Sequence, residues 1–343
     1  MHALRLFLIL LLCLSCCACA AGDAAGIPET TPLPTPQVVE GMRRNDAGIP
    51  LLEVYLHEEE IIRAMDIETY VCGVLAGEMR NDWPLEALKA QAILARTFVL
   101  KFISEKQSRY AGADISTDIT EAQAYNAAEI NERIEQAVQE TCGQVLLTDA
   151  GELPYAWFHA HSGGQTALAR EALGWNDPEP SYTRVTDGLD SPSAPEEAAA
   201  WSAVFPVKQF LRACRAAGAE AETAEEVAIG KKGASGRAVT LLVDGVSVPA
   251  AELRLALGST VMRSTLLTEL SSDGAYVRMA GRGYGHGVGM PQWGAYALAQ
   301  DGMTGEEIAT YYYDGLHVAT LWESTPAARA LEIAPCARPS VRV

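Results

Sequence analysis

The sequence predicts an α+β fold, because strand-like and helix-like segments follow one another irregularly along the 343 residues. A regular strand–helix–strand rhythm, which marks a parallel α/β sheet, is absent from this pattern. The content of 49% hydrophobic and 20% charged residues is typical of a folded globular protein. The length allows one large domain or two, with ample apolar sequence to build a core.

The charge balance excludes one class of partner. The formal net charge is -18 at pH 7, whereas nucleic-acid binding needs clustered lysines and arginines to contact phosphates. The same acidity disfavours an anionic lipid surface as a partner. A neutral ligand remains open.

The N-terminus has the pattern of an export signal. A weakly basic start at His2 and Arg5 precedes an apolar run over residues 6–21, and Ala18-Cys19-Ala20 resembles a cleavage site. Residues 3–22 would also be long enough to span a membrane, and one of the nearby cysteines could carry a lipid. We therefore predict that residues 1–22 are a signal peptide or membrane anchor, and that the chain acts outside the cytoplasm, anchored or secreted.

Composition divides the rest of the chain. Residues 23–50 are rich in Pro and Thr, which favours an extended tether over a packed segment. Alternation of apolar and polar residues begins at Leu51, whereas residues 321–343 carry little pattern. We predict a tether over 23–50, a folded domain over 51–320 and a C-terminal tail over 321–343.

Local signals predict the main elements in order. A strand at 51–56 precedes a helix that opens at Pro84 and runs to about Ser104, since proline is tolerated in the first turn. The remaining predicted elements are a helix over 129–140, a hairpin of strands 145–147 and 154–161, a helix over 207–216, a hairpin around Asp244-Gly245, a helix over 251–257, a strand over 276–280 and a helix over 304–313 that starts with the capping box at Thr304.

Glu78 is the first candidate for chemistry. It follows the small and apolar run Gly73-Val-Leu-Ala-Gly77 and precedes the helix that opens at Pro84. Loss of hydration disfavours the charged form of a carboxyl group and raises its pKa, which is how a glutamate becomes a proton donor near neutral pH. The alternative is an acid that merely flanks a helix.

Polar residues on the predicted helix are the next candidates. Helical periodicity places Gln91 inside the apolar face, where it needs hydrogen-bond partners as a structural tie or as part of a polar site. Lys89 and Arg96, seven residues apart, share one edge of that face. They are candidates to orient Glu78 or to bind a ligand, and a solvated edge is the alternative.

A glycine-rich segment over 281–295 contains His286 and Gln292. Its glycines allow close approach of the backbone to a ligand or to another strand. The P-loop signature is absent, so a nucleotide site is not predicted. His286 is a ligand, an acid or base, or a hydrogen-bonded core histidine.

Metal binding rests on three histidines. His159 and His161, two residues apart on a predicted strand, would face the same side, with His286 as a third zinc ligand. The spacing of His286 does not require this. The widely spaced Cys72, Cys142, Cys214 and Cys336 form no CxxC pair, and we expect most to be buried thiols. No Gly-x-Ser-x-Gly nucleophile elbow is present.

Several motifs together resemble one family. In order along the chain are Glu78-Met-x3-Trp-Pro-x-Glu-Ala-Leu-Lys-Ala-Gln91-Ala-x3-Arg96-Thr, the turn Ser162-Gly-Gly-x-Thr, and Gly-His286-Gly-Val-Gly-Met-x-Gln292-x-Gly-Ala. This pattern resembles the stage II sporulation protein D (SpoIID) family, which includes the LytB type of amidase enhancer. The resemblance covers roughly residues 51–316, with Pro291 where many relatives carry Ser.

The resemblance implies a peptidoglycan lytic transglycosylase with a two-lobed domain and a glycan-binding cleft. Glu78 falls on the catalytic glutamate, and a sporulation amidase would strip stem peptides from the glycan before cleavage, during engulfment. Hydrolytic glycosidases ordinarily use two carboxylates, whereas here the sugar's own C6 hydroxyl replaces water. Glu78 would then serve as acid first and base second, to give a 1,6-anhydro sugar.

The other site residues follow less directly. Lys89, Gln91, Arg96 and the turn residue Ser162 are candidates for glycan contacts, and His286 with Gln292 would form the opposite wall. Some relatives bind zinc through a His/Cys cluster that this sequence lacks, so no metal or other cofactor is predicted. Two alternatives stay open: a non-catalytic glycan-binding enhancer of an amidase, and, more distantly, a metal hydrolase built on the three histidines.

Overall fold

The computed structural model describes residues 35–323. The predicted signal or anchor, residues 23–34 of the tether and residues 324–343 of the tail therefore lie outside the described residues. Within 35–323, no helix combines the length and apolar character needed to cross a bilayer. The described elements are mixed, with 31% helix and 25% strand. The α+β prediction is confirmed, and the two-lobed arrangement with a cleft stays a prediction.

The packed part of the chain starts before Leu51. A short helix, α1 (Gln37–Glu40), carries Val39, which is fully buried. Ile49 is buried as well, and both residues belong to the first hydrophobic core. The predicted start at residue 51 was therefore too late, because two apolar residues in a Pro-rich segment suffice to hold it against the core.

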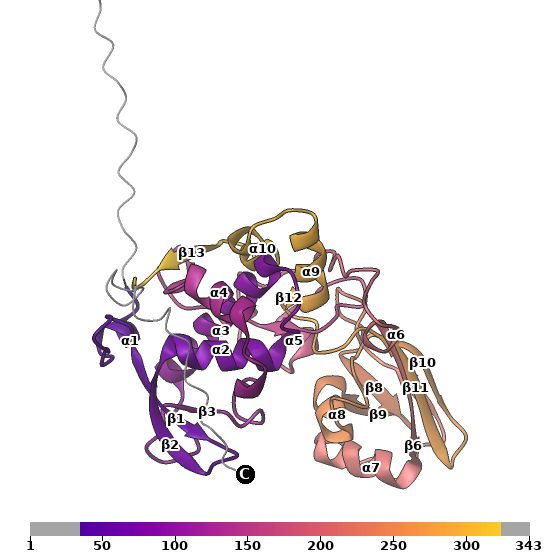
Figure 1. Ribbon diagram of the computed structural model, residues 1–343. Helices are drawn as coiled ribbons and strands as arrows, with labels where there is room; N and C mark the ends of the chain where they lie inside the picture. The colour runs from indigo at the N-terminus through magenta and orange to yellow at the C-terminus, as the bar shows by residue number, and fades with distance from the viewer. Residues whose placement is uncertain (1–34, 324–343) are drawn as a thin grey trace, which may run out of the picture. The chain divides into compact units, whose positions relative to one another are not determined.

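The first core surrounds one long helix, α3 (Leu85–Glu105), which packs against α2, α4, α9 and α10. Pro84 precedes its first turn, as predicted, and thirteen of its side chains are buried. Figure 1 shows α2, α3 and α4 lying together near the small β2–β1–β3 sheet. The bounds of these neighbours are β1 (Leu51–Leu56), β2 (Ile61–Asp66), α2 (Ile67–Glu78), β3 (Ile115–Ser116), the 3-10 turn η1 (Ala127–Glu129) and α4 (Glu132–Glu140).

Distant segments complete this core. The strand β4 (Gln144–Thr148) pairs antiparallel with β13 (Leu316–Thr320), and β5 (Phe158–His159) pairs parallel with β12 (Met290–Pro291). The predicted hairpin of residues 145–147 with 154–161 was therefore wrong. Alternation identifies a strand but not its partner, and both partners come from the far end of the chain.

Two helices follow β12 directly. The helix α9 (Gln292–Gln300) begins at the residue after the strand, and α10 (Gly305–Tyr311) packs against α3. Thr304 caps α10 in a capping box with Glu307, as predicted. The glycine-rich segment thus runs between the second half of the molecule and a helix of the first core.

A second hydrophobic core forms between residues 200 and 282. Its sheets have the orders β10–β11–β6 and β7–β8–β9, and α7 and α8 pack against each other beside them (Figure 1). The helix predicted over 207–216 is confirmed as α7, and Asp244-Gly245 forms the predicted hairpin turn. The bounds are α5 (Ala169–Ala172), α6 (Glu196–Ala199), β6 (Ala200–Pro206), α7 (Val207–Ala216), β7 (Val227–Ile229), β8 (Thr240–Val243), β9 (Val246–Pro249), α8 (Ala250–Leu257), β10 (Leu267–Ser272) and β11 (Tyr276–Arg282).

Two of the cysteines predicted to be thiols can be assessed. Cys214 is buried in the second core, and Cys72 is half-buried on α2; neither forms a disulfide. Burial raises the pKa of both thiols, that of Cys72 to about 12 and that of Cys214 to about 11. Both therefore stay protonated at neutral pH. Cys336 lies outside the described residues.

A buried ion pair joins α2 to α3. The guanidinium of Arg96 is fully buried and contacts Glu68 at 2.5 Å between Nη2 and Oε2. Glu68 also accepts hydrogen bonds from the backbone N–H of Gly143 at 3.0 Å and from Nε1 of Trp322 at 2.9 Å. The pair thus ties the start of α2 to α3 and to the end of the β4–β13 ribbon at which Gln144 pairs with Thr320.

Replacement of Arg96 by Met should lower the free energy of unfolding by about 3–5 kcal/mol, because it leaves the Glu68 carboxylate buried without its counter-charge. The matched control is Arg63→Met, which breaks the exposed Arg63–Glu59 pair and should cost at most about 1 kcal/mol. Urea denaturation of both variants measures the difference. Equal costs for the two variants would show that the buried pair is not a main tie of the first core.

Candidate active site

Glu78 is the last residue of α2 and combines partial exposure with a desolvated carboxyl group. Asp66 caps the start of this helix by accepting from the backbone N–H of Thr69, and the chain becomes extended at Met79. Burial raises the pKa of Glu78 from its ordinary value of 4.5 to about 7. The side chain is only partly covered, so a ligand can still reach it. A carboxyl group of this kind can exchange a proton near neutral pH.

The loop over 123–125 supplies the main hydrogen bond to this carboxyl group. The backbone N–H of Ala124 donates to Oε1 of Glu78 at 2.7 Å, which opposes the effect of burial on the pKa. The loop reaches α2 because Gly73 and Gly77, one turn apart, have no side chains. A Cβ at Gly77 would lie 2.7 Å from the backbone of Ala124, and one at Gly73 would lie 2.2 Å from the ring of Tyr125.

Gln292 approaches Glu78 from the other side. It is the first residue of α9 and is buried, and its Nε2 donates to the backbone carbonyl oxygen of Glu78 at 3.1 Å. Its side-chain amide also lowers the pKa of the Glu78 carboxyl group, less than Ala124 does. The structure thus brings together the two residues that the sequence placed on opposite walls.

Aromatic rings gather next to this pair. Trp83 and Trp293 have ring centroids 4.6 Å apart, and Tyr296 lies 5.2 Å from Trp83 and 5.4 Å from Trp293. Trp293 and Tyr296 are partly exposed. An open hollow of about 240 Å³ lies beside the end of α2 and is lined by Ala76, Met79, Arg80, Asn81, Asp82 and Glu129. The surroundings of Glu78 thus offer both aromatic faces and polar groups.

Two buried glutamines near the site have unsatisfied amides. Gln91 is fully buried, as its place on the apolar face predicted, and Gln123 precedes the Ala124 that contacts Glu78. The described residues supply no hydrogen-bond partner for either oxygen or either nitrogen of these two amides. Buried amides normally find partners, so a structural tie within the described residues does not explain Gln91.

Lys89 and Arg96 are engaged elsewhere. Lys89 pairs with Glu86 at 2.7 Å and with Glu140 at 2.5 Å, while Arg96 binds Glu68. Glu68 and Glu78 stand ten residues apart on α2, which is about 15 Å along a helix. Neither cation orients Glu78 in this structure, and the solvated edge predicted as the alternative is wrong for Arg96, which is fully buried.

Ser162 and His286 hold the backbone of their own segments. Ser162 is buried, donates through Oγ to Asp190 and accepts from the backbone N–H of Gly164. In His286, Nδ1 accepts from the backbone N–H of Val288 at 3.0 Å. Burial and the nearby Arg254 and Arg237 lower the pKa of His286 to about 3, against a hydrogen bond to the backbone of Phe158. The geometry fits a neutral, hydrogen-bonded histidine among the three predicted roles.

The three histidines do not converge. His159 and His286 have ring centroids 5.6 Å apart, whereas Nδ1 of His161 accepts from the backbone N–H of Gly163 and lies 3.3 Å from Asp190. Among residues 35–323, no group of three His, Cys, Asp or Glu side chains is arranged to hold a metal ion. His161 is instead engaged in a separate network with Gly163 and Asp190.

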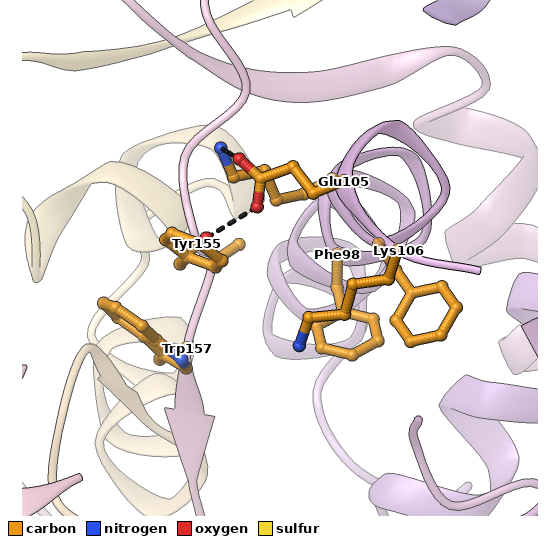
Figure 2. A pocket seen from close by; sticks show the side chains of 8 residues that line it. Phe98, Glu105, Lys106, Tyr155 and Trp157 are labelled. Atoms are coloured by element: carbon orange, nitrogen blue, oxygen red, sulfur yellow. Dashed lines mark hydrogen bonds and ion pairs between the residues drawn. The ribbon is translucent and has the colours of Figure 1, made fainter. Parts of the chain in front are cut away.

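A second hollow lies at the far end of α3. Figure 2 shows Tyr155 and Trp157 facing Phe98 and Lys106, with Tyr155 donating to Glu105 at 2.6 Å. Its volume is about 30 Å³, room for one or two water molecules but not for a sugar ring. It does not compete with the surroundings of Glu78 as a substrate site.

Sequence reasoning missed the loop partner of Glu78. A backbone N–H such as that of Ala124 leaves no mark in the choice of side chain. The available signal was the spacing of Gly73 and Gly77, which places two glycines on one helical face and predicts that another segment packs closely there.

Comparisons with known proteins agree with these motifs. The family described as stage II sporulation protein matches residues 55–147. An uncharacterised protein of Brachyspira hyodysenteriae is 30% identical over 75% of this chain and 68% of its own length. The stage II sporulation protein D of Bacillus subtilis is 28% identical over 83% of each chain. The chain belongs to the SpoIID family.

The family also includes a longer relative. The amidase enhancer of Bacillus subtilis is 29% identical over 71% of this chain, which spans only 39% of the enhancer's length. This SpoIID-family chain is thus similar to the enhancer over the matched region, which is less than half of the enhancer's length.

Replacement of Glu78 by Gln should make this SpoIID-family protein more stable at pH 8 than the wild type, by at most roughly 3 kcal/mol. The folded-state pKa of about 7 lies above the ordinary 4.5, so the protonated carboxyl contributes stability fully below pH 4.5. That contribution is lost as the pH rises through about 7, whereas glutamine does not titrate. Urea denaturation of both proteins between pH 4.5 and 8 measures the difference in their free energies of unfolding. The contributions of the other titrating groups are the same in both proteins and cancel in this difference. A difference that does not change with pH would contradict the raised pKa.

Proposed function

We propose that this protein is a lytic transglycosylase that cleaves the bond from N-acetylmuramic acid to N-acetylglucosamine in peptidoglycan. The observation that carries the proposal is Glu78, a partly exposed carboxyl whose pKa lies at about 7. A mechanism with one acidic residue needs a carboxyl group that is protonated in the first step and ionised in the second, which a pKa near the working pH allows.

The proposed reaction uses Glu78 twice. Its protonated carboxyl gives a proton to the glycosidic oxygen as the bond to C1 of the muramic residue breaks. The C6 hydroxyl of the same sugar then attacks C1, and the Glu78 carboxylate takes the hydroxyl proton. The proton that Glu78 gave stays on the leaving sugar and the C6 hydroxyl proton replaces it, so water is not consumed and the product ends in 1,6-anhydro-N-acetylmuramic acid.

The surroundings of Glu78 suit a sugar polymer. Partly exposed Trp293 and Tyr296 present ring faces against which sugar C–H groups pack, and the adjoining hollow is polar. Gln292 holds Glu78 in place, whereas the amide of Gln91 is fully buried and presents no surface to a sugar. We assign Lys89, Arg96, Ser162 and His286 to the scaffold, because their polar groups are engaged within the protein.

The cellular setting is proposed from the family. Stage II sporulation protein D names two relatives and a third is named an amidase enhancer, which favours a role in cell-wall remodelling during engulfment. We propose that an amidase removes the stem peptides first and that this protein then cuts the bare strands. Export and attachment through residues 1–22 would place it on the outer face of the membrane.

A second candidate is a glycan-binding enhancer without catalysis of its own. The relative named amidase enhancer, 29% identical over 71% of the chain, supports it. Under this alternative Glu78 contacts glycan but transfers no proton. The two candidates differ in their products.

Purified protein incubated with denuded glycan strands should yield 1,6-anhydro ends, detected by mass spectrometry. Glu78→Gln should lower the rate by roughly 10²–10⁴-fold, because general acid–base catalysis contributes about that much. The matched control, Glu105→Gln at the far end of α3, should keep the activity. Reducing ends would indicate hydrolysis and refute the mechanism, and intact strands that still bind the protein would favour the enhancer.

The rate should fall as the pH rises above about 7, because the first step needs protonated Glu78. Gln292→Ala should shift this fall to higher pH, since the Gln292 amide lowers the pKa of Glu78. A pH–rate profile of kcat/KM for both proteins measures the two midpoints. A profile with no loss of rate between pH 7 and 9 would remove Glu78 as the acid.

A further inference from the structure

Positive charge gathers around the glycine-rich segment although the chain is strongly acidic. Arg254 is 9% exposed, and its Nε donates to the backbone carbonyl oxygen of Arg263 at 3.0 Å. The same oxygen accepts from the backbone N–H of Gly285 at 2.8 Å. The guanidinium carbon of Arg263 lies 5.0 Å from the ring centroid of Tyr284. We refer to Arg254, Arg263 and Tyr284 as the arginine cluster.

The arginine cluster lacks the usual counter-charges. In the described part of the chain, neither Arg254 nor Arg263 forms an ion pair, and both contact backbone carbonyls while Arg263 also lies over an aromatic ring. Burial lowers the pKa of Arg254. Arginines are almost never buried without a charged partner. An anionic ligand would supply the partner that the protein does not.

A third arginine adds to the same field. Arg237 is fully buried, and its Nη atoms donate to the backbone carbonyls of Ser162 and Gln165 at 2.6 and 2.9 Å. Its Nε has no hydrogen-bond partner among the described residues, and the nearby carboxylates of Glu171 and Asp190 act on its charge without forming an ion pair with it. A Cβ at Gly287 would lie 2.4 Å from its guanidinium. The positively charged guanidinium of Arg237 therefore lies directly beside the backbone of the glycine-rich segment.

The arginine cluster is connected to the surroundings of Glu78. Gln292, which contacts Glu78, follows Pro291, and Pro291 is paired with His159. Two residues further along, His161 is bridged to Tyr284 of the cluster. The two residues of chain from His159 to His161, about 7 Å when extended, thus join the strand pair beside Gln292 to the arginine cluster.

We propose that Arg254, with Arg263 beside it, binds the free lactyl carboxylate of a muramic residue on the glycan strand that Glu78 cleaves. This rests on the proposed function and adds a specificity-determining contact to it. An amidase that removes a stem peptide converts the lactyl amide into a carboxylate, so one neutral group becomes an anion. Guanidinium groups bind carboxylates through paired, charge-assisted hydrogen bonds, whereas an amide at the same position offers no charge.

The test compares two ligands that differ only at the lactyl group: denuded glycan oligosaccharides, and the same oligosaccharides with each lactyl carboxylate converted to a methylamide. Calorimetric titration uses the full chain carrying Glu78→Gln, so that the ligands stay intact. The protein should bind the free carboxylate form about 10-fold or more tightly than the methylamide, as expected for a hydrogen bond to a charged group. Equal affinity for both ligands would overturn the inference.

Three variants in the same background locate the preference. Arg254→Lys and Arg263→Gln should each remove most of the preference while affinity for the methylamide stays unchanged. Arg212→Gln on the exposed face of α7 removes one positive charge elsewhere and should leave the preference intact. Circular dichroism checks that each variant is folded. If Arg254→Lys is unfolded, the ligand preference of Arg263→Gln tests the inference, because Arg263 is partly exposed and its replacement disturbs the packing less. A loss of affinity for both ligands alike would show a structural role only and overturn the assignment.

A third ligand, the free stem peptide, identifies the source of the carboxylate. Arginine-dependent binding of the peptide at equal affinity would overturn the lactyl assignment. Failure of this inference is distinguishable from failure of the proposed function. Anhydro products formed by the wild type, together with equal binding of free and amidated glycan, would leave the reaction standing and refute only the arginine contact.

Discussion

The candidate site depends on the contact between the Ala124 loop and the last turn of α2. Gly73 and Gly77 let the backbone of this loop lie directly against the helix, and this approach does two things at once. It covers the Glu78 carboxyl, which raises its pKa, and it presents one backbone N–H to Oε1, which moderates the rise. The two opposing effects leave the pKa at about 7. A side chain at position 77 would separate the loop from the helix and remove both.

Gln292 extends this contact to a part of the chain more than two hundred residues away. Its hydrogen bond to the Glu78 backbone fixes the start of α9 against the end of α2. Because α9 follows β12 directly, the β5–β12 pair and the glycine-rich segment are positioned by the same bond. Glu78 is thus held between a loop of the first core and the segment that follows the second.

Local signals in the sequence predicted much of the fold and little of the site. Pro84, the capping box at Thr304 and the amphipathic run over 207–216 act within a few residues, so their helices could be identified. The partners of β4 and β5 could not, because strand pairing depends on segments that are far apart in sequence. Arg96 shows the same limit. Periodicity placed it on a helix edge, but Glu68, twenty-eight residues earlier, makes that edge an interior.

The apolar run before Glu78 and the periodicity around Gln91 identified these two residues, but the family motifs also selected residues whose polar groups are used to build the scaffold. Ser162 and His286 belong to motifs as distinctive as that of Glu78, but their hydrogen bonds hold tight turns of the backbone. Arg254 fits the family pattern only loosely in the sequence, and its lack of a counter-charge is visible only when its neighbours in space are known. A glutamate that has lost water and an arginine that lacks an anion are complementary features. The first suits a proton transfer to a neutral glycosidic bond, and the second suits an ionised group on the same polymer, so a sugar chain that carries carboxylates would satisfy both.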